Sequence, residues 1–198
     1  MKIMKKITLL VVICIGLLIG CKKEAGPVTK TENPAKATVD SKITVDTLQI
    51  RNTGNWEFGQ KFYVSRNGNI TKLGCKLAAT GTFKVSLWDY ATSSLIITVP
   101  ITVADTTQFT YSSITSIAVT ANTRYVISVN NTSAGINKPY YVYYKKPGLG
   151  SIAYPFTTGS ITYETGLYKG AAPAPVFPDV TGTDGFWGIP DIQFEYTE

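Results

Sequence analysis

Arg124-Tyr125-Val126-Ile127-Ser128-Val129 is the stretch that decides the fold class, because every second side chain in it is large and apolar. Successive residues of a β-strand point to opposite faces, so these three side chains would lie together on one face. The same pattern occurs in Thr82-Phe83-Lys84-Val85-Ser86-Leu87, and the stretch from Asp191 to Tyr196 alternates polar with apolar residues. A period of two predicts strands that turn one side to a core and the other to water.

The chain continues this pattern from Ile43 onward. Short runs rich in Val, Ile, Thr, Tyr and Phe are separated by Gly, Asn, Pro and Ser at intervals of about 8 to 14 residues, and no segment keeps a helical period. We therefore predict one all-β domain over residues 43–198: an antiparallel β-sandwich, jelly-roll-like, with about nine or ten strands. Pro100 indicates a strand near a sheet edge, and Asn67-Gly68 predicts a tight hairpin turn.

The first twenty residues have the composition of a lipoprotein signal peptide. A short basic stretch precedes the apolar run Ile7 to Ile19, which is too short to span a bilayer comfortably. The run ends in Leu17-Leu18-Ile19-Gly20-Cys21, which resembles the lipobox of bacterial lipoproteins. That resemblance implies cleavage after residue 20 and acylation of Cys21. The alternative is a cleaved soluble secretory signal in which Cys21 is incidental.

Residues 21–42 contain no aromatic residue and few branched apolar ones. Such a segment cannot bury enough surface to offset its ordering entropy, so we expect a flexible, lipid-anchored tether. Two or three acyl chains at Cys21 would hold the protein at a membrane without spanning it. Lys22, in the place of an aspartate, resembles the outer-membrane address of a Gram-negative lipoprotein, with either membrane face left open.

The formal net charge of +6 does not indicate nucleic-acid binding. Most of the excess belongs to the leader and the tether, and residues 43–198 hold eleven Lys and Arg against ten Asp and Glu. The domain therefore has no basic field to hold phosphates. Cys75 stands two residues from Leu73 and two from Leu77, so strand alternation puts its side chain on the same face as theirs. This predicts a small core residue rather than a reactive thiol.

The chain contains no histidine. This removes the usual general base, the histidine-dependent triads and the commonest transition-metal ligand, and with them most hydrolase designs. Paired carboxylates for glycoside cleavage stay open, although most of the acids stand beside turn residues. We therefore expect a protein that is not an enzyme and that needs no cofactor.

Three acids near the C-terminus are candidate metal ligands. Asp179 and Asp184 lie in the longest irregular stretch, Gly166 to Ile189, and Asp191 follows shortly after it. Sandwich loops often hold calcium through Asp and backbone oxygens, so a structural calcium site at these three residues stays open. Their spacing matches no EF-hand, and ordinary turn chemistry is the competing interpretation.

Aromatic residues are the more informative excess, because all 23 Phe, Trp and Tyr follow residue 42. A core of this size cannot enclose them all. In Pro139 to Lys146, strand alternation places Tyr140 and Tyr144 on one face and Tyr141 and Tyr143 on the other, so we expect at least one pair at the surface or beside a loop and take Tyr141 and Tyr143 as the candidates. Exposed aromatic rings form platforms on which sugars stack, so Trp187, Trp56, Tyr141 and Tyr143 are candidate ligand-binding residues. The alternative is that the tyrosines are ordinary strand residues.

Several short motifs, taken together and in order, resemble the bacterial family catalogued as domain of unknown function 4082. They are Phe58-Gly59-Gln60-Lys61-Phe62, Gly68-Asn69-Ile70-Thr71-Lys72-Leu73, Leu87-Trp88, Val119-Thr120-Ala121-Asn122-Thr123-Arg124-Tyr125-Val126, Gly166-Leu167-Tyr168, Phe186-Trp187 and Asp191-Ile192-Gln193-Phe194. The resemblance implies a β-sandwich module of secreted and surface proteins, with no catalytic activity attached to it.

These observations favour a non-catalytic, membrane-tethered extracytoplasmic binding module, with a carbohydrate as the candidate ligand. The alternative is a structural or assembly protein of the cell envelope that contacts a protein partner. A glycan, an envelope protein and the membrane itself are thus the expected partners, and nucleic acid is not.

Overall fold

The structure, a computed structural model, describes residues 26–145, 152 and 154–198. The expected signal peptide, residues 1–20, and the expected acylation site, Cys21, lie outside the described residues. The single helix within them has eight residues, and none of the described helical structure is long and apolar enough to cross a membrane.

The described residues form sixteen strands and one helix, so the expected nine or ten strands are too few. In chain order the elements are β1 (Thr29–Glu32), α2 (Pro34–Ser41), β2 (Thr47–Arg51), β3 (Trp56–Val64), β4 (Gly68–Cys75), β5 (Gly81–Asp89), β6 (Ser94–Val103), β7 (Thr110–Val119), β8 (Arg124–Asn130), β9 (Thr132–Ser133), β10 (Ile136–Asn137), β11 (Tyr140–Tyr144), β12 (Phe156–Thr158), β13 (Ile161–Gly170), β14 (Val180–Gly182), β15 (Phe186–Trp187) and β16 (Pro190–Thr197). Several of the additional strands have only two or three residues, too short for a period-two pattern to reveal.

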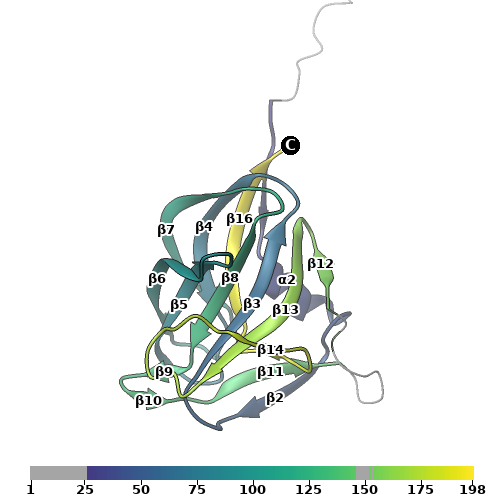
Figure 1. The fold of residues 1–198 in the computed structure, drawn as a ribbon. Coiled ribbons are helices and arrows are strands. Elements are labelled where there is room, and N and C mark those ends of the chain that lie inside the picture. The colour runs from purple at the N-terminus through teal and green to yellow at the C-terminus, as the bar shows by residue number, and fades with distance from the viewer. Residues whose placement is uncertain (1–25, 146–151, 153) are drawn as a thin grey trace, which may run out of the picture.

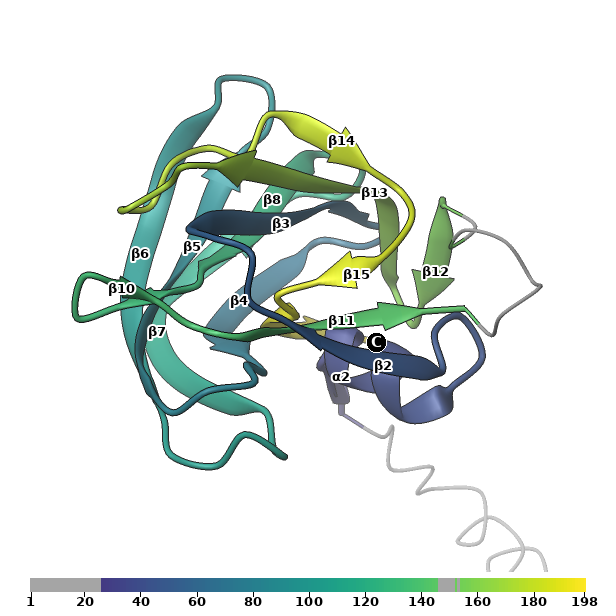
Figure 2. The same cartoon turned by 90° about the horizontal axis from the view of Figure 1, so that it is seen from below.

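Two large sheets pack face to face, which confirms the all-β sandwich (Figure 1). The larger sheet has the order β12-β13-β3-β8-β5-β6, with β14 added beside β13. The smaller has the order β1-β16-β4-β7. A third sheet, β15-β11-β2, lies across one end of the sandwich, as the view from below shows (Figure 2). All pairings between the described strands are antiparallel.

The core lies between the two large sheets and is built from the residues that the alternation predicted. Phe83, Ile127 and Val129 from the larger sheet, and Leu73 and Phe194 from the smaller, are completely buried. Fully burying a side chain of this size stabilises the fold by about 1.5 to 3 kcal/mol each. Cys75 belongs to this core, which confirms its prediction, and burial raises the pKa of its thiol to about 12.

Two local expectations have different outcomes. Pro100 lies in β6, the last strand of the larger sheet, which confirms the edge position. The hairpin at Asn67-Gly68 is wrong, because β3 and β4 belong to different sheets and the turn carries the chain from one layer to the other. Asn67 instead accepts a hydrogen bond from the Ala121 backbone N–H at 2.8 Å.

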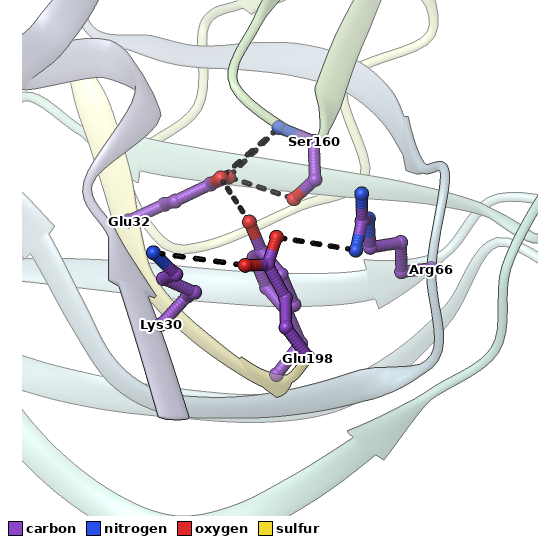
Figure 3. A network of polar contacts seen from close by, with 6 residues as sticks. Lys30, Glu32, Arg66, Ser160 and Glu198 are labelled. Atoms are coloured by element: carbon purple, nitrogen blue, oxygen red, sulfur yellow. Dashed lines mark hydrogen bonds and ion pairs between the residues drawn. The ribbon is translucent and has the colours of Figure 1, made fainter. Parts of the chain in front are cut away.

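Residues 29–41 are part of the fold, so the expected flexible tether over residues 21–42 is wrong for this part of the chain. β1 pairs with β16 along all four of its residues, and α2 buries Ala35 and Val39 against the core. Polar contacts hold β1 as well: Glu32 accepts hydrogen bonds from Ser160 and Tyr196, and Lys30 pairs with Glu198 (Figure 3). This segment folds despite its few apolar residues, because β16 and the core of the domain supply the contacts that stabilise it.

A buried carboxylate caps the N-terminus of α2. Asp191 of β16 accepts hydrogen bonds from the backbone N–H groups of Ala35 at 2.9 Å and Lys36 at 3.1 Å. These are the unpaired donors of the first helical turn, which the preceding Asn33 side chain does not cap. The helix is therefore fixed by a residue more than 150 positions away in the sequence.

The two ends of the sandwich differ in what they carry. The first described residues and the C-terminus lie together at the upper end in Figure 1, where Val28 and Glu198 pair through their backbones. β2 and β11 lie at the lower end. We use upper end and lower end in this sense below.

Candidate functional site

A cleft of about 240 Å³ opens at the lower end, between the small sheet β15-β11-β2 and the adjoining ends of β3 and β13. Its lining combines five aromatic side chains with one aliphatic, one hydroxyl and two charged side chains. The lining residues are Trp56, Phe58, Tyr140, Tyr168, Trp187, Val142, Thr53, Arg51 and Asp184.

The aromatic rings form one continuous surface around Phe58, which is only 3% exposed. The Phe58 ring centroid lies 4.4 Å from that of Tyr140, 6.0 Å from that of Trp56 and 6.1 Å from that of Trp187. Tyr168 also contacts both indoles, at 5.8 Å for Trp56 and 5.2 Å for Trp187. These spacings lie in the range favoured for aromatic pairs, so the rings support one another.

Asn131 fixes the position of Trp56. The backbone N–H of Trp56 donates to the Asn131 side-chain oxygen at 2.7 Å, and the Asn131 N–H donates to the Trp56 carbonyl at 3.0 Å. The Asn131 side-chain amide also donates to the Gly54 carbonyl at 3.0 Å. Because Asn131 is completely buried, the start of β3 is held rigidly against the end of β8.

Trp187 is positioned by β15 and by two glycines. β15 pairs with β11 so that Trp187 lies opposite Val142. A Cβ at Gly185 would come within 2.1 Å of the Trp187 indole nitrogen, and one at Gly182 within 2.6 Å of its six-membered ring. The indole therefore lies directly on backbone, in space that only glycine leaves open.

Two polar atoms of the aromatic walls are satisfied within the protein. The Trp56 indole N–H donates to the Thr53 hydroxyl oxygen at 3.2 Å, and the Thr53 and Tyr140 hydroxyls are hydrogen-bonded at 2.9 Å. Arg51 and Asp184 form no ion pair with any described residue. The Arg51 guanidinium instead lies 5.5 Å from the centroid of the Tyr144 ring. The cleft thus offers a ligand ring faces, one guanidinium and one carboxylate, together with the polar atoms of Tyr168 and Trp187.

The structure separates the four predicted ligand-binding aromatics. Trp56 and Trp187 come together in the cleft, although they are 131 positions apart in the sequence. The expected surface position of Tyr141 and Tyr143 is wrong, since each is only 7% exposed. β11 is the central strand of its sheet, and Lys76 covers these two rings, with its ammonium 5.6 Å from the centroid of Tyr141.

The three predicted calcium ligands do not come together. Asp179 is exposed and pairs with Lys169 at 2.6 Å, and Asp184 lies in the cleft lining. Asp191 is buried beneath α2, where the Tyr111 hydroxyl also donates to it at 2.6 Å. Within the part of the chain that the structure describes, no three His, Cys, Asp or Glu side chains group as a metal site would require.

A second buried carboxyl lies outside the cleft lining. Glu57, next to Trp56 in β3, accepts hydrogen bonds from the Ser128 hydroxyl and from the Asn130 side-chain amide at 3.0 Å. The Trp88 indole N–H donates in turn to Ser128 at 2.8 Å. Burial raises the pKa of Glu57 to about 7, against the lowering effect of these hydrogen bonds.

Most of the cleft lining was not anticipated from the sequence. Arg51 and Thr53 follow an unremarkable strand, and Phe58 and Tyr140 have the pattern of core residues. Tyr168 stands in one of the family motifs, Gly166-Leu167-Tyr168, which is the only signal that pointed to it. Asn131 gave no signal at all, because its contacts join the start of β3 to the end of β8, which are distant in sequence.

Fold and cleft together define an all-β sandwich module with an aromatic cleft at one end. The chain belongs to the family described as Domain of unknown function (DUF4082), which matches residues 43–187. The match includes Arg51, Trp56, Tyr140, Asp184 and Trp187, and so spans the whole cleft. A search of curated proteins gives no match to this chain.

Proposed function

We propose that this protein is a non-catalytic binding module, tethered to the bacterial cell envelope by lipid on Cys21, and that its aromatic cleft binds carbohydrate. The observation that carries the proposal is the convergence of two indoles, three further aromatic rings, a guanidinium and a carboxylate on one small cleft. Apolar faces of sugar rings pack on such aromatic surfaces, and their hydroxyls pair with charged side chains.

The composition of the cleft favours binding over catalysis. Hydrolysis of a glycosidic bond commonly uses two carboxyl groups on either side of the bond, at separations of about 5 to 9.5 Å. Asp184 is the one carboxyl among the described lining residues, and the chain has no histidine to act as a base. A ligand held here would be bound and released unchanged.

The position of the cleft suits a tethered protein. The described chain begins at the upper end of the sandwich, and the cleft opens at the lower end (Figure 1). An anchor attached ahead of the first described residue would therefore leave the cleft facing away from the membrane. Mass spectrometry of the mature protein tests this part of the proposal: we expect acyl chains on an N-terminal Cys21, and unmodified material starting elsewhere would contradict it.

Alanine substitution in the cleft tests the proposed ligand. On a glycan array, the full chain should retain a defined set of glycans, and Trp56→Ala and Trp187→Ala should each weaken their binding at least tenfold. Stacking on an aromatic ring contributes about 0.5 to 1.5 kcal/mol to the binding free energy, in addition to the contribution from the apolar area that it buries. Tyr141→Phe, outside the cleft lining, is the matched control and should bind as the unchanged chain does. Equal binding by the tryptophan variants and the control would contradict the proposal.

One further observation favours contact with a protein partner as a second candidate function. β2 is an open sheet edge, and its Leu48 and Ile50 side chains are 44% and 63% exposed. Exposed apolar edge strands readily pair with another chain. If this function is correct, an envelope protein should co-purify in a fixed ratio, and Leu48→Thr with Ile50→Thr should release it. Retention of that protein by the double variant would count against the edge as its site.

A further inference from the structure

The two charged side chains of the cleft narrow the class of ligand that it can take. Arg51 contributes one positive charge and Asp184 one negative charge, so the lining as a whole is neutral. Neither side chain is neutralised by an ion pair within the described residues. Each therefore needs water or a ligand as its hydrogen-bonding partner.

A hydroxyl group satisfies both side chains, because it donates to a carboxylate and accepts from a guanidinium. A ligand that carries a single carboxylate or ammonium would gain one favourable charge contact and meet one unfavourable contact. It would also lose more hydration on entering an apolar cleft than a neutral ring would. Charge thus favours a neutral polyhydroxylated ligand.

The size of the cleft sets a second limit. Its volume of about 240 Å³ is below the range of roughly 300 to 1,000 Å³ typical of pockets for drug-sized ligands. The hydrogen bonds of Thr53 to Trp56 and Tyr140 also leave these two walls with ring faces rather than free donors. The volume of the cleft and its aromatic walls therefore suit a single ligand ring, which stacks on the walls and forms hydrogen bonds through the groups at its edge.

We infer that the cleft recognises a single neutral sugar ring, packed against the aromatic walls, with hydroxyls donating to Asp184 and accepting from Arg51. This inference rests on the proposed carbohydrate-binding function and adds to it both the charge and the number of rings recognised. A longer neutral glycan would be held by one of its rings, with the remainder in solvent.

Titration of the full chain at pH 6 tests the charge of the ligand. The probes are the methyl glycosides of glucose, galactose and mannose, with the matching uronates and 2-amino sugars. We expect the best neutral ring to bind at least tenfold more tightly than its charged counterparts. Asp184→Asn should raise the affinity of the uronate relative to the neutral ring at least tenfold, and Arg51→Gln should do the same for the amino sugar. Asp105→Asn and Arg66→Gln, outside the cleft lining, are the matched controls.

The outcomes separate this inference from the proposed function. A uronate or amino sugar that binds the unchanged chain as tightly as the neutral ring would overturn the inference. So would cleft variants that leave the affinity ratios unchanged, or a trisaccharide that binds more than tenfold more tightly than its monosaccharide. In each of these cases the tryptophan variants would still report glycan binding. If no sugar or glycan binds at all, the proposed function itself fails.

Discussion

Single residues decide much of this molecule's chemistry, and the buried Glu57 is the clearest case. Its carboxyl group is completely inaccessible to solvent yet accepts hydrogen bonds from the side chains of Ser128 and Asn130. Desolvation opposes the charged form more strongly than these donors favour it, so the pKa rises from 4.5 to about 7. The folded state therefore holds this proton more tightly than the unfolded state does.

This raised pKa predicts that the protein loses stability as the pH rises. The contribution of Glu57 is fully present below about pH 4.5 and is lost progressively up to about pH 7. For one proton the slope is at most about 1.4 kcal/mol per pH unit. Burial also raises the pKa of Asp191, to about 6, so Asp191 adds to the slope below that pH. Glu57→Gln should therefore reduce the slope and flatten it above about pH 6, as measured by urea unfolding at several pH values between 4.5 and 7.5. An unchanged slope in the variant would show that Glu57 does not titrate in this range, whereas the exposed Asp105→Asn should leave the slope as it is.

Gly185 predicts a coupling with Trp187. Because a Cβ at position 185 would lie 2.1 Å from the indole nitrogen, Gly185→Ala should displace the ring and lower the free energy of unfolding by about 1 to 3 kcal/mol. In a chain that already carries Trp187→Ala, the same change should cost less, since the ring is gone and only the Val142 methyl group, 2.7 Å away, still obstructs the new Cβ. Urea unfolding of the four chains measures this coupling. Equal costs in both backgrounds would mean that the glycine matters for another reason.

At the scale of elements, the N-terminal strand and helix are held by contacts that they do not themselves encode. β1 is an edge strand of four mostly exposed residues, and α2 has only eight residues, too few to be stable alone. Both depend on β16, which offers β1 a hydrogen-bonding edge and α2 the Asp191 carboxylate. Removing the pair would take from Asp191 two of its donors and the helix that covers it.

We therefore expect a chain that begins at residue 43 to be less stable than one that begins at residue 26. The difference should be at least about 3 kcal/mol, from the lost burial of Val39 and the orphaned carboxylate. Denaturant unfolding of the two chains measures it. Asp191→Asn in the longer chain should reproduce part of the loss. The exposed Asp179→Asn should change stability by less than about 1 kcal/mol, because surface ion pairs contribute little.

Equal stability of the two chains would place β1 and α2 outside the cooperative fold. Addition of a chelator supplies a further comparison, since Asp191 was one of the expected calcium ligands. Its two oxygens already accept from Ala35, Lys36, Tyr111 and Ile192. The effect of Asp191→Asn should therefore be the same with and without a chelator.

At the scale of the whole molecule, the sandwich separates the chain's starting end from its cleft. β3 runs from Trp56 in the cleft to Val64 at the upper end, so the length of one long strand lies between them (Figure 1). The polar contacts of Lys30, Glu32, Arg66 and Glu198 join the N-terminal and C-terminal strands at the upper end (Figure 3). If the chain is acylated at Cys21 as proposed, only residues 22–28 separate this end from the anchor.

This geometry predicts a fixed orientation for the acylated protein in vesicles. A fluorophore on Arg66→Cys, at the upper end, should transfer energy efficiently to an acceptor dye in the membrane. One on the exposed Ile136→Cys, at the lower end, should transfer much less. Cys75 is completely buried and will not compete for the label. Equal transfer from both positions would show that the domain tumbles freely on its anchor.

The sequence by itself determined the fold class, since the period of two in residues such as Tyr125, Ile127 and Val129 has one physical meaning. A strand that alternates in this way needs a partner sheet to cover its apolar face, and that requirement is local to each strand. The burial of Cys75 followed from the same alternation, and the edge position of Pro100 followed from the N–H group that proline lacks. One strand decides each of them.

Only the tertiary structure decided which residues meet. The cleft joins Arg51, Trp56, Tyr140, Tyr168 and Asp184, and strand pairings across the whole chain bring them together. The same pairings buried Tyr141 and Tyr143, made residues 29–41 part of the fold and placed Asp191 at the start of α2. Alternation specifies the face on which a side chain lies. Register and sheet order, which depend on contacts between distant segments, specify what lies opposite it.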